Sequence, residues 1–369
     1  MKNNPVNRNE EQIVFALRDL YEAYGYSQYK MVKFEEYDFY ARNKNFLVSD
    51  NIITFNDTNG KLMALKPDVT LSIIKNTTDK PDELHKVYYR ENVYRVSKSS
   101  HSFREIMQTG IECIGDIDSY CISEIINLAA SSLMLISDKC ILSIANMDIL
   151  SAAVDACTCD EDHKKEMLVY VGEKNVNAIR KLCCENSIDP AKADAVCEIS
   201  RLHGTPAKVF PALRSILGEC KCIDEFECTV NAVNNSLKDK IEIDFSYSGD
   251  VNYYNGIIFK GYIEGIPESV LSGGQYDGLM KKMGRQSGAI GFAVYIGTLE
   301  RLGNGEKYDV DTILLYDKDA DIVALNAAVK SIADTGVSVM AVKKIPEKLK
   351  CKKLMKFDGK EVKPLETDA

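Results

Sequence analysis

The chain contains 369 residues, of which 45% are hydrophobic and 27% are charged. These values are ordinary for a globular protein, and the length suits two or three domains. The net charge of -9 disfavours attachment to nucleic acid through a broad basic face, so tRNA is not an expected partner, although a local groove on an acidic protein can still be basic.

The N-terminal residues lack the pattern of a signal peptide, and the sequence contains no uninterrupted apolar run long enough to span a membrane. We therefore expect a cytoplasmic protein without membrane association. The twelve cysteines include no CxxC pair, and we interpret them as buried or free thiols of a reducing cytosol. This interpretation is favoured over a metal site at Cys157, Cys159 and His163, so we expect neither a metal nor a cofactor.

The N-terminal region predicts a helix followed by a strand. Residues 10–24 have apolar side chains at spacings of four, three and four, as in an amphipathic helix: Ile13, Leu17, Leu20 and Tyr24. Gly25 is placed to end this helix, and residues 26–34 alternate in the manner of a strand.

A hairpin and a second helix follow. Asn59 and Gly60 between two apolar runs predict a two-residue hairpin turn. Pro67 ends the second strand, and Asp68 and Thr70 then stand where a strand meets the N-terminus of a helix. They are either a plain helix cap or a cap that also faces a ligand.

Residues 87–115 form the most informative stretch, with two alternating runs that flank a polar loop. Arg95 closes the first run, and Arg104, Gln108 and Glu112 recur at four-residue spacing along the second. An arginine with amide and acid groups on one face suits a phosphate or an amino-acid zwitterion. The alternative is a solvated hairpin with ordinary surface charges.

The remaining segments predict an α+β fold built on a mixed, mainly antiparallel sheet. We expect a helix near residues 122–133, strands at 141–145, 240–247 and 253–264, a glycine-rich turn at 272–278, and a βαβ unit at 311–342 followed by a lysine-rich, solvated helix face. We divide the chain into a core of residues 1–155 and 236–303, a helical insertion at 156–235, and a small, truncated α/β domain at 304–369.

Several ordered blocks resemble the catalytic core of histidyl-tRNA synthetases, which are class II aminoacyl-tRNA synthetases. The blocks are AYGYSQYKMVKFEE near residue 30, LKPDVT, the 87–115 stretch, DVNYYNGIIFKGY, and SGGQYDGL with GAIGFAVYIGTLERL. The resemblance implies a class II synthetase-like core with flanking helices. It also implies a histidine-binding set comprising Asp68 (in place of the family's glutamate), Thr70, Gln108, Glu112, Tyr253 and Tyr254.

The groups that handle phosphate in that family are largely missing here. Arg95 matches the arginine that holds the ATP α-phosphate, and Arg104 is a further candidate anion contact. Other positions that match the family's functional residues carry different side chains: Ser97 for an acid, Gly249 and Asp250 for an arginine, Thr298 for the final arginine unless Arg301 replaces it, and Val32 for a proline. Adenylate formation relies on such charge-neutralising groups, so we assign no catalytic residue.

A synthetase-like core without adenylation groups resembles a paralogous family, the regulatory subunits of ATP phosphoribosyltransferase. LKPDVT, FREIMQTGIECIG and GFAVYIGTLERL carry this resemblance. It implies a non-catalytic subunit for the first step of histidine biosynthesis, which activates a short-form catalytic subunit within a hetero-octamer and takes part in feedback inhibition by histidine. It also implies a homodimer with residues 10–45 at the interface. The alternative is an active histidyl-tRNA synthetase-like enzyme that forms histidyl adenylate.

Overall fold

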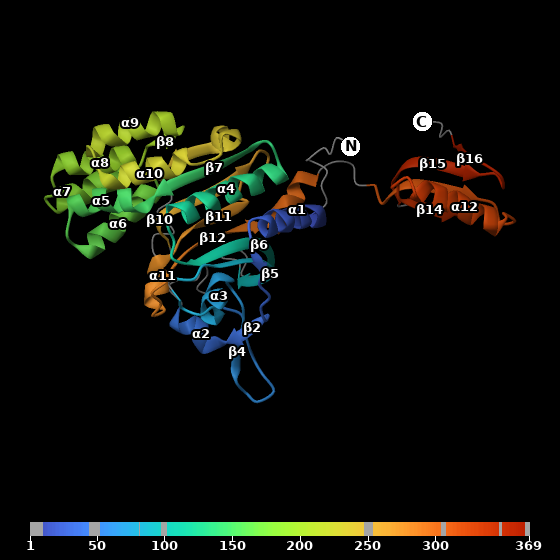
Figure 1. Cartoon of the computed structure of the whole chain (residues 1–369), viewed down its shortest axis with the longest axis horizontal. Helices are drawn as coiled ribbons and strands as arrows, with labels where there is room; N and C mark the ends of the chain where they lie inside the picture. Colours follow the sequence, from blue (N-terminus) through green and yellow to red (C-terminus); the bar gives the residue numbers. More distant parts are fainter. Residues whose placement is uncertain are drawn as a thin grey trace. The chain divides into compact units, whose positions relative to one another are not determined.

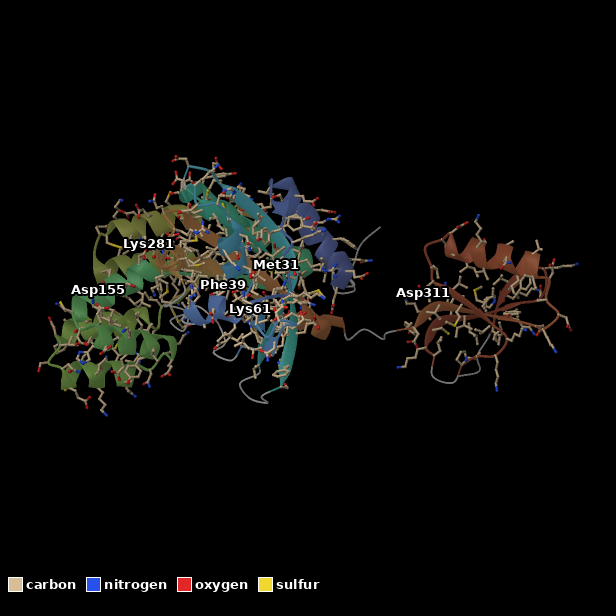
Figure 2. The ribbon with its side chains drawn as sticks, turned by 90° about the horizontal axis from the view of Figure 1, so that it is seen from below. Met31, Phe39, Lys61, Asp155, Lys281 and Asp311 are labelled. Carbon is tan, nitrogen blue, oxygen red and sulfur yellow. A yellow bond between two sulfur atoms is a disulfide. The ribbon has the colours of Figure 1, made fainter. Side chains whose placement is uncertain are left out.

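A computed structural model describes residues 10–43, 52–80, 82–96, 102–246, 254–303, 308–346 and 349–365, with the side chains of 300–303 outside this description. The chain forms two compact units, Met1–Leu302 and Gly303–Ala369 (Figures 1 and 2).

The first unit is built on a nine-stranded sheet. The strand order is β1-β5-β6-β12-β11-β10-β7-β9-β8, and only the β1–β5 and β7–β9 pairs are parallel. The strands are β1 (Ser27–Gln28), β5 (His85–Val96), β6 (Phe103–Gly115), β7 (Cys140–Asn146), β8 (His203–Gly204), β9 (Ile241–Asp244), β10 (Asn255–Ile263), β11 (Leu271–Gln275) and β12 (Gly288–Tyr295). The predicted α+β fold with a mixed, mainly antiparallel sheet is confirmed.

One face of this sheet is covered by α1 (Glu10–Ala23) and α4 (Ser119–Ile136), which pack on each other and on the central strands (Figure 1). The buried side of α1 consists of Ile13, Val14, Leu17 and Tyr21. The prediction that Tyr24 belongs to this buried side is wrong, because α1 ends at Ala23 and the ring of Tyr24 is exposed. By length and composition α4 is apolar enough to cross a membrane, but most of it is buried in this core, where helices pass the same test.

The opposite face carries a three-stranded sheet and three short helices. The small sheet has the order β2-β4-β3, and the elements on this side are β2 (Phe34–Glu36), α2 (Tyr37–Arg42), β3 (Thr54–Asn56), β4 (Leu62–Leu65), α3 (Thr70–Asn76) and α11 (Asp277–Lys282). A hairpin joins β3 and β4, but the predicted two-residue turn is wrong. The Asp57 N–H donates to the carbonyl oxygen of Lys61, so the loop consists of Thr58, Asn59 and Gly60, and of these only Gly60 has a positive φ, +79°. The single strand predicted at 26–34 is wrong, since β1 and β2 are separate strands in different sheets.

The glycine-rich segment 272–278 is mainly a strand, not the turn that its composition predicts. A Cβ atom at Gly273 would lie 2.3 Å from the carbonyl oxygen of Gly291, so the glycine permits close approach of β11 and β12. Glycine therefore serves here to bring two backbones together rather than to bend the chain.

Six helices and β8 occupy residues 147–231, in the region of the expected insertion (Figure 1). They are α5 (Met147–Cys157), α6 (Glu161–Gly172), α7 (Val176–Glu185), α8 (Pro190–Ile199), α9 (Pro206–Leu217) and α10 (Lys221–Asn231). Their buried side chains belong to the same continuous core as α1, α4 and the large sheet.

Cys220 and Cys222 are joined as a disulfide, with Cα atoms 5.5 Å apart, which lies within disulfide range. The prediction of free thiols is therefore wrong for these two residues, while the other ten cysteines are free. Among the described residues, no group of three His, Cys, Asp or Glu side chains is arranged to hold a metal ion.

The second unit contains the predicted βαβ arrangement, with β13 (Val310–Tyr316), α12 (Ile322–Ala333) and β14 (Val339–Val342), and the two strands are parallel. The expectation of a helix face after residue 342 is wrong, because β15 (Cys351–Phe357) pairs with β13 and β16 (Val362–Pro364) pairs with β15. Met355 and Phe357 pack into the apolar cluster of this unit, while the lysines of the strand are exposed.

Candidate functional site

The predicted histidine-binding residues gather around Glu112 of β6. The Glu112 carboxyl accepts a hydrogen bond from Thr70 Oγ1 at 2.6 Å and another from the hydroxyl of Tyr276. The residue is only 2% exposed. Burial, together with the nearby Asp68 carboxyl, raises the pKa of Glu112 to about 8, although the two hydroxyl donors oppose this shift.

Glycines provide the room for this carboxyl. Gly291 of β12 lies directly opposite Glu112, and a Cβ atom there would lie 1.8 Å from Glu112 Oε2. Gly274 of β11 is the next residue along the same row, and a Cβ atom there would lie 2.8 Å from the ring of Tyr254. The side chains of Glu112 and Tyr254 therefore rest on a floor of bare backbone.

The loop between β4 and α3 supplies the second acid. Asp68 Oδ1 accepts the backbone N–H of Leu71 at 2.9 Å, so it caps the helix as predicted. Thr70 does not act as a cap, because its hydroxyl donates to Glu112. Burial raises the pKa of Asp68, whereas the Leu71 N–H and the charge of Arg95 act in the opposite direction.

Gln108 lies four residues before Glu112, on the same face of β6, and is buried. Its neighbours across the sheet are Glu91 of β5 and Tyr295 of β12. The hydroxyl of Tyr89 lies within 2.7 Å of the position that a Cβ atom of Gly110 would take, which places it between Gln108 and Glu112. The interpretation of Gln108 and Glu112 as surface strand residues is thus wrong.

The two candidate anion contacts differ in their surroundings. Arg95 and Arg104 are directly opposite each other in the β5–β6 hairpin. Arg95 is half-buried, and its Nε donates to the carbonyl oxygen of Pro67 at 3.0 Å, next to Asp68. Arg104 is exposed at the outer end of the hairpin.

Tyr253, Ser97, Gly249 and Asp250 lie outside the described residues, as does the side chain of Arg301. Thr298 is described, and its hydroxyl donates to the carbonyl oxygen of Tyr295 at 2.6 Å.

Tyr276 and Gly291 were not identified as site residues from the sequence. Tyr276 follows two glycines at the end of β11, and only the fold shows that its hydroxyl reaches Glu112, which is 164 positions away. The glycines of β11 and β12 are evident in the sequence. That they lie beside Glu112 follows from how the strands are paired, which composition does not reveal.

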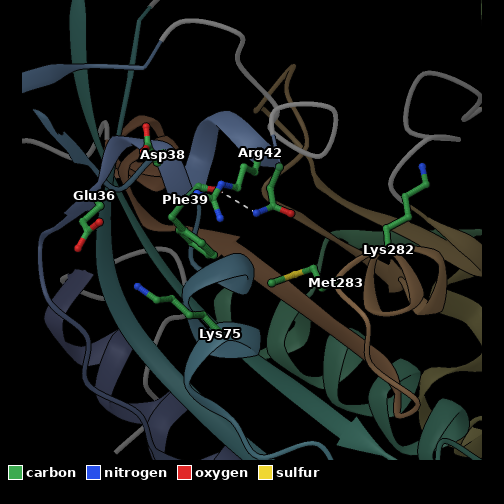
Figure 3. A pocket seen from close by; sticks show the side chains of 8 residues that line it. Glu36, Asp38, Phe39, Arg42, Lys75, Lys282 and Met283 are labelled. Atoms are coloured by element: carbon green, nitrogen blue, oxygen red, sulfur yellow. Dashed lines mark hydrogen bonds between the residues drawn. The ribbon is translucent and has the colours of Figure 1, made fainter.

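A separate cavity of about 600 Å³ lies among α2, α3 and α11 (Figure 3). Figure 3 shows Phe39, Lys75 and Met283 on its wall, with charged residues on either side. None of the eight lining residues belongs to the Glu112 cluster: Glu36, Asp38, Phe39, Arg42, Asn43, Lys75, Lys282 and Met283.

The sheet order, the long β5–β6 hairpin and the polar cluster above β6 define a class II aminoacyl-tRNA synthetase-like protein. The chain belongs to the histidyl-tRNA synthetase family, whose sequence profile matches residues 4–299. The resemblance inferred from the ordered sequence blocks is confirmed.

Individual relatives extend this result. The chain is 27% identical to an ATP phosphoribosyltransferase regulatory subunit from Clostridium kluyveri over 326 residues, covering 84% of this chain and 83% of the relative. Its fold matches an ATP phosphoribosyltransferase regulatory subunit/histidyl-tRNA synthetase from Bacillus halodurans C with a TM-score of 0.75 and 20% identity, over 90% of this chain and 88% of the other. It also matches a chain of an ATP phosphoribosyl transferase (HisG:HisZ) complex from Thermotoga maritima, with a TM-score of 0.62 and 18% identity, over 78% of this chain and 97% of the other.

Proposed function

We propose that this chain is a non-catalytic regulatory subunit of ATP phosphoribosyltransferase. In this role it stimulates a short-form catalytic subunit and transmits feedback inhibition by histidine. The observation that carries the proposal is the buried acidic cluster of Asp68 and Glu112, combined with the similarity to regulatory subunits over most of the chain.

The chemistry of the cluster suits an amino acid better than a phosphate. Two buried carboxyl groups favour a ligand that brings positive charge or N–H donors, because burial without such partners is unfavourable for carboxylates. Histidine offers both an α-ammonium group and an imidazole, and the Gln108 amide adds a donor and an acceptor. Arg95 is held at the edge of the cluster by Pro67, where it suits the ligand's carboxylate.

We further propose a homodimer that uses residues 10–45, within a hetero-octamer that also contains the catalytic subunits. Within the described part of this segment, Phe15, Val32 and Phe34 expose apolar side chains. The ring of Phe34 packs edge-on against Phe55 with centroids 5.6 Å apart, which extends the apolar surface onto β3. Sedimentation velocity of the chain alone checks the dimer, and Phe34→Asp should shift it towards monomer.

The central test is the activity of a short catalytic subunit with and without this chain. We expect stimulation by the wild-type chain, and inhibition of the complex when histidine is added. Thr70→Val removes a donor to Glu112 and should weaken the response to histidine, whereas Thr229→Val removes a hydroxyl from helix α10 and should leave it intact. Absence of stimulation by the wild-type chain would contradict the proposal.

Family membership favours one second candidate, an enzyme that forms histidyl adenylate. Arg95 beside the Asp68 loop supports it, and Thr298 at the position of the family's last arginine opposes it. Histidine-dependent exchange of pyrophosphate into ATP separates the two functions. We expect no exchange above background.

A further inference from the structure

We propose that Tyr295, anchored by Ser272, determines the size of the ligand by admitting a free amino acid and excluding a nucleotide. This inference rests on the proposed function, since it concerns the same cluster around Glu112. It assigns a specificity-determining role to a side chain whose hydroxyl contacts Ser272.

Small residues occupy several positions beside Glu112 on its face of the sheet. From Glu112 towards Gln108, the residues of β6, β12 and β11 that share this face are Gly110, Gly291, Ala293 and Gly274, whereas Ile114 lies on the other side of Glu112. Because these positions carry little or no side chain, the Glu112 carboxyl, the Tyr89 hydroxyl and the Tyr254 ring lie directly over the strands. Tyr295 breaks the pattern, because it projects a full aromatic ring from β12 at the position directly opposite Gln108.

Contacts at both ends hold Tyr295 in place. Its hydroxyl lies 2.5 Å from Ser272 Oγ on β11, so the ring spans from one strand to the next. Its backbone N–H donates to Val270, and its carbonyl oxygen accepts the Thr298 hydroxyl at 2.6 Å. The half-buried Tyr295 ring is therefore held in one position, and we call it the wall of the site.

The position of this wall matters for any ligand larger than an amino acid. Arg95 and Arg104 lie on the same sheet face as Glu112, beyond Gln108 towards the outer end of the hairpin. A nucleotide joined to an amino acid at Glu112 must extend towards these arginines, over the row formed by Gln108 and Tyr295. A free amino acid ends before that row. Steric exclusion of the larger ligand is an effective means of specificity.

The test compares Tyr295→Ala with the wild-type chain by isothermal titration calorimetry, using histidine and ATP as separate probes. We expect Tyr295→Ala to bind ATP at least about tenfold more tightly than the wild type, and to bind histidine with little change. Tyr295→Phe keeps the ring but loses the Ser272 contact, and should exclude ATP less well than the wild type but better than Tyr295→Ala. Tyr120→Ala removes an exposed tyrosine on α4 and serves as the matched control.

Each outcome is decisive. Equal ATP affinity in Tyr295→Ala and the wild type, with the fold retained by circular dichroism, overturns the inference. Similar gains in Tyr120→Ala and Tyr295→Ala overturn it as well, because the effect is then not specific to the site. If the wild type binds no histidine, the proposed function fails, while the ATP comparison still tests the wall.

Discussion

At the residue scale, Glu112 should make the stability of the protein depend on pH. Its pKa rises from an ordinary 4.5 to about 8 in the folded protein because the carboxyl is buried. Between these values the folded protein holds a proton that the unfolded chain has lost, so the free energy of unfolding falls as pH rises. The stabilisation is fully present below pH 4.5 and is lost as pH passes 8.

Urea denaturation at several pH values measures this effect. Glu112→Gln keeps this side chain neutral at every pH. Its free energy of unfolding should therefore fall less with rising pH than that of the wild type, by at least about 1.4 kcal/mol, the equivalent of one pKa unit. Glu124→Gln removes a different buried carboxyl, which pairs with Lys86. In this variant the free energy of unfolding should still fall with rising pH as it does in the wild type. A wild-type profile that matches that of Glu112→Gln would show that Glu112 is ionised throughout.

Gly291→Ala tests the backbone floor beneath Glu112. The added methyl group would lie 1.8 Å from Glu112 Oε2 and 2.4 Å from the carbonyl oxygen of Ile111, so both the acid and the strand must move. We expect a loss of about 1–3 kcal/mol in the free energy of unfolding, typical of overpacking, and weaker histidine binding. Gly297→Ala, with open space around its Cβ position, should change neither quantity. Denaturant titration and calorimetry measure the two effects.

The sequence was informative about the acids and amides of the site but not about their support. Asp68, Thr70, Gln108 and Glu112 were identified from ordered blocks and alternation, and the structure brings them to one place. Tyr276 was missed, because its contact with Glu112 depends on how distant strands pair. Register between segments far apart in sequence is set by tertiary packing, which local patterns do not contain.

At the element scale, Arg285 ties the C-terminus of α3 to the loop before β12. Its guanidinium donates to the carbonyl oxygens of Thr77 and Ile74 at 2.8 and 2.9 Å. Both acceptors lie at the end of the helix, where backbone carbonyls lose their regular partners, although the Ile74 oxygen also accepts the Thr77 N–H at 3.4 Å. Since α3 begins with Thr70, the position of the Thr70 hydroxyl depends on this clamp.

We therefore expect Arg285→Ala to lower the free energy of unfolding by about 1–3 kcal/mol, the usual range for hydrogen bonds from a charged donor that leave acceptors unpaired. Histidine affinity should fall at the same time, as measured by calorimetry. Arg180→Ala, which removes an exposed ion pair with Asp194 in the helical region, should have little effect on either. Unchanged histidine affinity in Arg285→Ala would mean that α3 holds its place without the clamp.

Errors of prediction at this scale share a physical cause. The segment 272–278 has the composition of a turn, yet it is a strand because glycine lets β11 approach β12 closely. Residues 351–357 carry lysines that suggest a solvated helix, yet they form β15 because a partner strand and Phe357 outweigh local preference. Tertiary context decides such segments.

At the scale of the whole molecule, composition and length indicated more than one unit, and the two units differ greatly in their cores. The first has a continuous buried core that joins the large sheet to helices α5–α10. The second has a small cluster centred on Leu314, Leu325 and Phe357. A small apolar core supplies little stabilisation, so the second unit should be the less stable of the two.

Phe357→Ala should therefore unfold the second unit selectively. Phe357 is fully buried at the end of β15, opposite Tyr316 of β13, and removal of a buried aromatic side chain typically costs about 3–5 kcal/mol. Hydrogen exchange followed by mass spectrometry should show loss of protection in β13 and β15, while β6 and α4 keep theirs. Val169→Ala, at an exposed position on α6, is the control and should alter neither region. Loss of protection in β6 as well would show that the two units unfold as one. In that case Phe357→Ala would also lose histidine binding.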